Sequence, residues 1–166
     1  MTAASRRGLG IGLAIAVLAL DQASKWWIVH HIMAAPKVIQ VTSFFNLVLG
    51  YNRGVSFGMF GSGEEFGRWA LVALALAIVT ALTVWLVRAE KPLLAAALGM
   101  IIGGAVGNVL DRARLGGVVD FLDFHAFGYH WPAFNVADTG ITVGAALLIF
   151  DSIFGDHDGP AEDKKG

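Results

Sequence analysis

The chain has 166 residues, of which 56% are hydrophobic and 15% are charged, and its formal net charge is −1. Soluble domains carry about 25% charged residues, so this composition favours a membrane protein. The near-zero charge excludes proteins that bind nucleic acid through a clustered basic surface. The sequence contains no cysteine, which excludes a disulfide framework, thiolate catalysis and a cysteine-ligated metal site.

Long apolar stretches predict four transmembrane helices. The stretches cover residues 8–29, 69–87, 92–110 and 132–150, and their only charged residues are Asp21, Lys25 and Asp138. A helix needs roughly 20 residues to cross the hydrocarbon core of a bilayer, and each stretch approaches or reaches that length. The predicted helices cover about residues 9–29, 68–87, 92–111 and 133–152.

The connection between the first two helices has a different composition. Residues 36–66 contain β-branched and aromatic runs followed by repeated glycines, a pattern typical of strands and turns. The predicted fold is therefore an all-α integral membrane protein, with a small extracytoplasmic β-rich unit between helices one and two. Residues 1–154 form a single domain in this prediction. Residues 155–166 are polar and interrupted by Gly and Pro, which predicts a disordered tail.

An even number of spans places both chain ends on the same side of the membrane. The short turn between the second and third predicted helices carries Arg88 and Lys91, as cytoplasmic loops tend to. We therefore expect cytoplasmic termini, with the longer connections on the outer side.

Several carboxylates are expected at the outer ends of the helices. Asp138 falls inside the predicted fourth helix, where an ionisable group is costly to bury and marks a functional site. Asp111 is expected to end the third helix, and Asp120 and Asp123 follow in the connection 112–131. Two carboxylates a few ångströms apart share a proton, which suits an aspartic protease that activates a water. From the residues alone, either Asp111 or Asp120 could be the partner of Asp138.

Other interpretations of these aspartates stay open at this point. They could merely end helices and pair with Arg112 and Arg114. A metal could be bound by the outer carboxylates and imidazoles, which are Asp120, Asp123, His125 and His130. The sequence has neither the H-E-x-x-H motif of metalloproteases nor the G-x-S-x-G motif of serine hydrolases.

Two further protein classes compete with a protease. A small transporter or proton-coupled carrier would also have Asp and Asn within its membrane spans. Its polar residues would be spread through the depth of the membrane, whereas in this sequence they concentrate at one interface. A non-catalytic assembly subunit would use the glycines of the third helix for close packing, which are Gly99, Gly103 and Gly107. Such a subunit would not need two approaching carboxylates.

Four segments, in chain order, resemble the motifs of lipoprotein signal peptidase, also called signal peptidase II. They are DQASK at 21–25, YNRGVSF at 51–57, GNVLDR at 107–112 with VVDF at 118–121, and FNVAD at 134–138. The resemblance extends from residue 8 to residue 152. Ser56, where the family often has Ala, is a conservative departure.

The resemblance implies an intramembrane aspartic endopeptidase that removes the signal peptide from prolipoproteins. Cleavage would occur on the amino side of a diacylglyceryl-modified cysteine, at the outer face of the bacterial inner membrane. It implies that Asp120 and Asp138 are the catalytic pair. The positions that it implies to bind substrate or support the pair are Asp21, Lys25, Asn52, Gly54, Gly104, Asn108, Asp111, Arg112, Asn135 and Ala137. The resemblance implies no metal or organic cofactor. It implies a monomeric enzyme whose partners are the prolipoprotein substrate and the membrane lipids.

Helical spacing gives some of these residues neighbours. Asp21 and Lys25 lie one turn apart, so we expect an ion pair that shields both from lipid. Asn108 and Arg112 share a helix face, and Arg112 should reach a carboxylate or the substrate. The connection 112–131 should fold back over the helix ends and bring Asp120 to Asp138, with the 30–68 segment on the same side.

Overall fold

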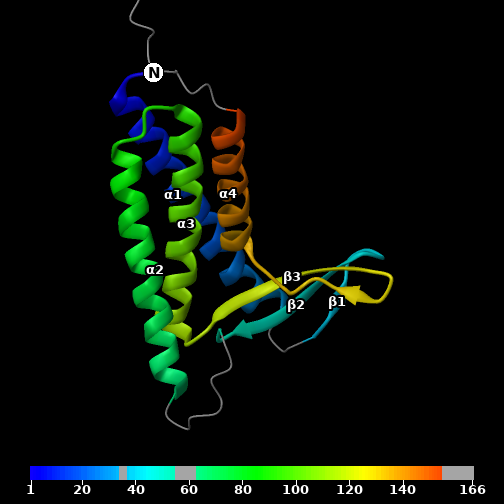
Figure 1. Ribbon diagram of the computed structural model, residues 1–166. Helices are drawn as coiled ribbons and strands as arrows, with labels where there is room; N and C mark the ends of the chain where they lie inside the picture. The colour runs from blue at the N-terminus through cyan, green and yellow to red at the C-terminus, as the bar shows by residue number, and fades with distance from the viewer. Residues whose placement is uncertain (34–36, 55–62, 155–166) are drawn as a thin grey trace, which may run out of the picture.

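The computed structural model describes residues 1–33, 37–54 and 63–154. Within them, four helices are long and apolar enough to cross a membrane, and an antiparallel sheet of order β1-β2-β3-β4 lies at one end of the bundle (Figure 1). The helices are α1 (Ala3–Trp27), α2 (Gly63–Val87), α3 (Pro92–Leu115) and α4 (Val136–Phe154). The strands are β1 (Ile39–Gln40), β2 (Phe45–Asn52), β3 (Val118–Ala126) and β4 (Tyr129–His130). The predicted tail and motif residues 55–57 lie outside the described residues.

The helix ends differ from the predicted ones because local capping residues set them. The Thr2 side chain accepts a hydrogen bond from the Ser5 amide at 3.1 Å, so α1 begins at Ala3. At its other end α1 continues into a π-helical turn, η1 (Ile28–Ile32). Helix α3 runs a full turn beyond Asp111 and ends at Leu115, where Gly116 adopts the left-handed conformation with a φ of 78°.

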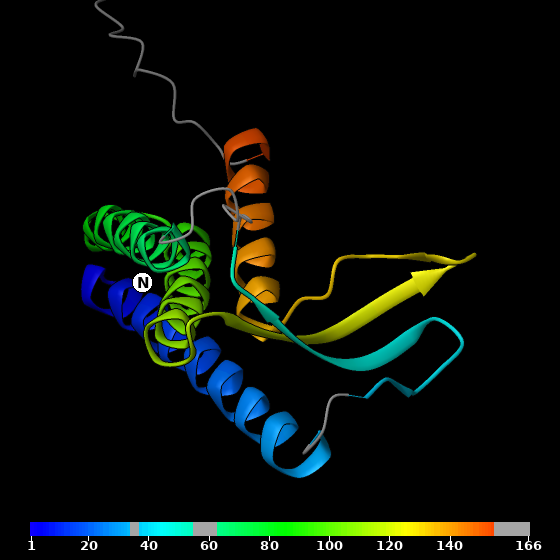
Figure 2. The ribbon, with the colours of Figure 1, turned by 90° about the horizontal axis from the view of Figure 1, so that it is seen from below.

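Helix α3 is the centre of the bundle and contacts α1, α2 and α4 (Figure 2). Its glycines allow this arrangement. A Cβ atom at Gly103 would collide with the backbone of Ala14 in α1, and one at Gly104 would collide with the backbone oxygen of Ala137 in α4. The predicted close packing of the third helix is therefore confirmed.

Arg6, Arg7 and Lys91 lie at the end of the bundle that is remote from the sheet. The described chain begins there, and α4 ends there (Figure 1). Arg6 and Arg7 of α1 donate to the backbone oxygens of Ala89 and Val87 at 3.2 and 2.9 Å, which satisfies carbonyls at the C-terminal end of α2. Lys91 pairs with Asp151 at 3.6 Å and links α3 to α4.

The sheet takes its strands from two connections, the one between α1 and α2 and the one between α3 and α4, which corrects the predicted confinement of the β-rich unit between helices one and two. Residues 118–130, predicted as part of a loop, form β3 and β4. The β-branched and aromatic residues of β3 favour a strand, and β3 pairs with β2 in an antiparallel register that is interrupted between Leu47 and Gly50. In this register Gly50 lies opposite Asp120, and Asn46 lies opposite Asp123.

One face of β3 packs against the π-helical turn that follows α1. Val119 and Phe121 form a buried apolar cluster with Ile28 and Met33. Successive side chains along a strand point to opposite faces, so Asp120 faces away from this cluster. Its side chain meets Asn135 at the beginning of α4.

Candidate active site

The structure places Asp138 in the first turn of α4, the third residue of that helix. We predicted a deeper position because the apolar run begins at Pro132, but α4 begins only at Val136. Asn135 directly precedes the helix and accepts a hydrogen bond from the Asp138 amide at 2.9 Å. The Asn135 amide donates to the Asp138 carboxylate at 3.3 Å, so the two residues cap the helix reciprocally.

Asn135 also joins Asp138 to Asp120. Its side-chain Nδ2 donates to the Asp120 carboxylate at 2.7 Å. Asn135 is fully buried and Asp120 is 4% exposed, so water does not compete for this contact. One asparagine therefore holds a carboxylate of β3 and a carboxylate of α4.

Two further asparagines donate to the same pair of carboxylates. Asn108 of α3 donates from Nδ2 to Asp138 at 2.8 Å, and Asn52 of β2 hydrogen bonds Asp120. The Asn52 side-chain oxygen is occupied by the amide of Gly54 at 2.9 Å, which leaves its Nδ2 group for the carboxylate. Gly54 has a φ of 87°, a conformation that favours glycine.

Burial raises the pKa of the Asp120 carboxyl above its ordinary value. Hydrogen bonds from Asn52 and Asn135 oppose the rise, repulsion from the Asp138 carboxylate adds to it, and the field of Lys25 opposes it. The two carboxylates therefore interact electrostatically, as a pair that shares a proton requires.

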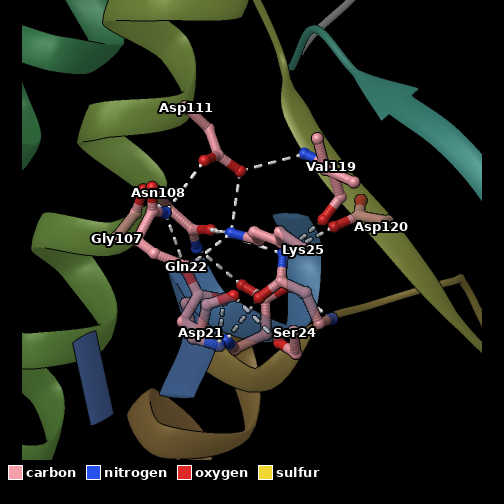
Figure 3. A network of polar contacts seen from close by, with 12 residues as sticks. Asp21, Gln22, Ser24, Lys25, Gly107, Asn108, Asp111, Val119 and Asp120 are labelled. Carbon is pink, nitrogen blue, oxygen red and sulfur yellow. Dashed lines mark hydrogen bonds and ion pairs between the residues drawn. The ribbon is translucent and has the colours of Figure 1, made fainter. Parts of the chain in front are cut away.

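A buried charged network lies beside this pair (Figure 3). The Lys25 ammonium contacts the Asp21 carboxylate at 2.9 Å and the Asp111 carboxylate at 2.8 Å. It also donates to the side-chain oxygen of Asn108 at 3.3 Å. The predicted ion pair between Asp21 and Lys25 is confirmed, and Asp111 joins it instead of contacting Asp138.

The remaining predicted positions have structural roles around the pair. Ala137 is fully buried, and its backbone oxygen lies so near Gly104 that a Cβ atom on Gly104 would collide with it. Arg112 donates from Nη1 to the backbone oxygen of Asn108 at 3.5 Å, and its buried Nε has no hydrogen-bond partner among the described residues. In that part of the chain no carboxylate contact of Arg112 is seen, and the alternative expectation, that Arg112 reaches the substrate, stays a prediction.

A second polar group lies farther along the sheet. The Asp123 carboxylate accepts a hydrogen bond from Asn46 and contacts the His130 ring, both at 2.9 Å. The bond from Asn46, followed by the contact with His130, lowers the pKa of Asp123. His125 stacks on His130 with a centroid distance of 4.9 Å. Within the described residues, no group of three His, Asp or Glu side chains could hold a metal ion.

Gln22, for which no role was predicted, belongs to the network. Its Nε2 donates to the carboxylates of Asp21 and Asp111 at 3.1 and 3.0 Å. The available signal was an uncharged polar residue inside a predicted transmembrane helix, next to a carboxylate. Gly107 was assigned only to packing, yet a Cβ atom there would press on the Asp21 carboxylate.

Comparisons with known proteins decide the family. A model of signal peptidase (SPase) II matches residues 13–154. The chain belongs to the signal peptidase II family. A lipoprotein signal peptidase of Beijerinckia indica is 43% identical over 164 residues, 98% of each chain. One from Methylorubrum extorquens is 45% identical over 160 residues, 95% of this chain and 92% of the relative. Membership makes this chain a peptidase and confirms the resemblance found in its motifs.

Solved structures share the architecture. A bacterial membrane enzyme determined by the in meso method aligns with a TM-score of 0.74 at 31% identity, over 90% of this chain and 94% of that chain. A second structure of the same description aligns with a TM-score of 0.72 at 29% identity, over 92% and 94%. The likeness supports a membrane enzyme built from four spanning helices and a small sheet.

Proposed function

We propose that this peptidase is an aspartic endopeptidase that removes signal peptides from prolipoproteins, cleaving on the amino side of a diacylglyceryl-modified cysteine. The observation that carries the proposal is the pair formed by Asp120 and Asp138, bridged by Asn135. The names of the relatives supply the substrate class. Asn52, Gly54, Asn108 and the Lys25 network support the pair from the surrounding elements.

The raised pKa of Asp120 supports its assignment as the protonated member. Asp138 then accepts a proton from a water whose oxygen attacks the scissile carbonyl carbon, while Asp120 donates its hydrogen bond to the carbonyl oxygen. Collapse of the tetrahedral intermediate breaks the C–N bond, and the proton passes to the leaving amine. The products are a carboxylate on the signal peptide and a free amino group on the lipid-modified cysteine. The steps need water and two carboxylates and no cofactor.

In the proposed orientation, the active site faces the outer side of the bacterial inner membrane and both termini are cytoplasmic. Arg6 and Arg7 lie at the end of the bundle remote from the aspartates, beside the short turn that carries Arg88 and Lys91, and short cytoplasmic loops tend to carry such positive charges. The enzyme acts as a monomer surrounded by lipid. Its substrate reaches the aspartates from the bilayer, where the acyl chains of the modified cysteine are already anchored.

A direct test compares two synthetic prolipoproteins that differ only in lipidation. The purified enzyme in detergent should release the signal peptide from the diacylated substrate, seen by mass spectrometry as cleavage before the modified cysteine. The unlipidated substrate should be cleaved far more slowly, because each acyl CH₂ that is buried contributes about 0.8 kcal/mol. Equal rates on the two substrates, or cleavage at another bond, would contradict the proposed specificity.

A further inference from the structure

The charged network is connected to both catalytic residues through the backbone. The amide of Val119, which precedes Asp120, donates to the Asp111 carboxylate at 3.1 Å. The amide of Ala137, which precedes Asp138, donates to the Asp21 carboxylate at 2.9 Å. Each catalytic aspartate therefore follows a residue whose amide is held by a buried carboxylate.

A single ammonium group binds both of these carboxylates. Lys25 contacts Asp111 at 2.8 Å and Asp21 at 2.9 Å, and it is 4% exposed. The three charged residues come from α1 and α3, whereas the amides that they hold belong to β3 and α4. The ammonium thus lies where the four elements meet, as Figure 3 shows for Lys25, Asp21, Asp111 and Val119.

We propose that Lys25 is a positioning residue, which fixes the relative placement of Asp120 and Asp138 by drawing together the two aspartates that hold their neighbouring amides. The inference rests on the proposed function for its catalytic consequence, but the geometry stands independently of it. Lys25 also donates to the side-chain oxygen of Asn108. Because the Nδ2 group of Asn108 binds Asp138, this contact orients the amide toward that carboxylate.

Charge is needed for this role because both aspartates are buried at the end of a membrane-spanning bundle. A buried carboxylate without a counter-charge is strongly disfavoured. Replacing Lys25 by Met keeps the unbranched, flexible stem of the side chain and removes the ammonium group with its charge. The carboxylates of Asp21 and Asp111 then lose their shared partner and separate or take up protons, which loosens their hold on Ala137 and Val119.

The catalytic test measures kcat and KM of Lys25→Met on the diacylated substrate, per mole of folded enzyme. We expect kcat to fall about 100-fold, since a misplacement of 1 Å has that effect, while KM changes by less than about threefold because the buried Lys25 cannot touch substrate. Lys25→Arg restores the charge, and its kcat should be at least tenfold higher than that of Lys25→Met. Ser24→Ala is the matched control, because among the described residues the Ser24 hydroxyl is seen to bond the backbone oxygen of Asp21 and none of the network's charged side chains.

The structural test uses amide hydrogen exchange and does not depend on catalysis. In Lys25→Met, the amides of Val119 and Ala137 should exchange faster than in the parent, while amides in the middle of α2 keep their rates. If Lys25→Met does not fold, Asp111→Asn provides the second measurement. It should speed exchange at Val119 and leave Ala137 unchanged, because Asp21 holds the Ala137 amide.

The outcomes separate this inference from the proposed function. Unchanged exchange at Val119 and Ala137, or an unchanged kcat per folded Lys25→Met enzyme, would overturn the positioning role even if Asp120 and Asp138 prove catalytic. A second outcome is faster exchange at Val119 and Ala137 in Lys25→Met, together with normal cleavage by Asp120→Asn or Asp138→Asn. It would contradict the aspartic mechanism but would support the role of Lys25 in holding the two amides. Loss of folded protein alone, with normal kcat in the remainder, would make Lys25 a purely stabilising residue.

Discussion

Asn135 combines a structural and a chemical task in one side chain. Its oxygen caps α4 through the Asp138 amide, and its nitrogen binds the Asp120 carboxylate. The cap fixes where α4 begins, and the beginning of α4 fixes where Asp138 lies. The proposed catalytic geometry therefore depends on the same hydrogen bonds that start the helix.

The pKa of Asp120 leads to a prediction about pH. Its rise means that Asp120 keeps a proton at a pH where an ordinary aspartate has lost it, so activity should fall on the alkaline side as Asp120 ionises. Asn52 opposes the rise by binding the ionised carboxylate. Asn52→Ala should therefore move the alkaline limb of the kcat profile to higher pH, measured with the diacylated substrate across a range of buffers.

Asn46 provides the matched control on the same strand. Its side chain donates to Asp123 instead of Asp120, at 2.9 Å. Asn46→Ala should leave the alkaline limb in place while weakening the sheet by about 1–3 kcal/mol, the usual effect of a lost hydrogen bond to a buried charged group. A shift of the limb to lower pH in Asn52→Ala, or an equal shift in both variants, would show that Asp120 does not control it.

The sequence could name candidate functional residues but could not pair them all. Asp111 and Asp120 are equivalent candidates along the chain, and only their partners distinguish them. Asp111 binds Lys25, which comes from α1, and Asp120 binds Asn135, which precedes α4. Local spacing could predict the pairing of Asp21 with Lys25, because both lie on one helix, but contacts between distant elements leave no local pattern.

At the scale of elements, β3 shows why a strand was predicted as a loop. Val118–Ala126 carries carboxylates at Asp120 and Asp123, both of which are buried, so the segment lacks a simple alternation of apolar and polar residues. Each aspartate is satisfied by an asparagine, Asn135 for Asp120 and Asn46 for Asp123. Hydrogen bonds to distant residues therefore allow a buried strand where the local polar residues indicate a loop. The transmembrane helices were predictable because their apolar composition is a local property.

The contact between α3 and α4 supports a second prediction, on Gly104. Gly104→Ala introduces a Cβ atom against the backbone oxygen of Ala137 and the side chain of Ile141, neither of which can move without shifting α4. Overpacking of this kind costs about 1–3 kcal/mol. Because Ala137 precedes Asp138, we expect kcat to fall by about tenfold or more, measured with the diacylated substrate.

Gly12 of α1 is the control for the same substitution. A Cβ atom there meets nothing within 4 Å. Gly12→Ala should therefore keep the parent activity and a thermal unfolding midpoint at least as high as that of the parent, since Ala favours helix more than Gly does. Full activity in Gly104→Ala would show that the close approach of α3 and α4 is not needed for catalysis.

At the scale of the whole molecule, the polar network occupies one end of the bundle, and Arg6 and Arg7 of α1 occupy the other, beside the turn that carries Arg88 and Lys91. This separation predicts the orientation of the chain in the membrane. The sequence lacks cysteine, so single introduced cysteines report their own accessibility. In spheroplasts, Tyr129→Cys at the exposed hairpin should react with a membrane-impermeant maleimide. Ser5→Cys near the start of α1 should react only after permeabilisation, and the reverse pattern would invert the proposed topology.

The catalytic pair is the central claim, and single-turnover cleavage of the diacylated prolipoprotein by Asp120→Asn and Asp138→Asn tests it most directly. An amide cannot exchange a proton as a carboxyl group does, so each variant should lose about 10³-fold or more in rate, within the usual contribution of general acid–base catalysis. Asp123→Asn, a buried aspartate of the same strand, should retain activity within about threefold of the parent. A rate within tenfold of the parent for either Asp120→Asn or Asp138→Asn, in a folded protein, would contradict the account.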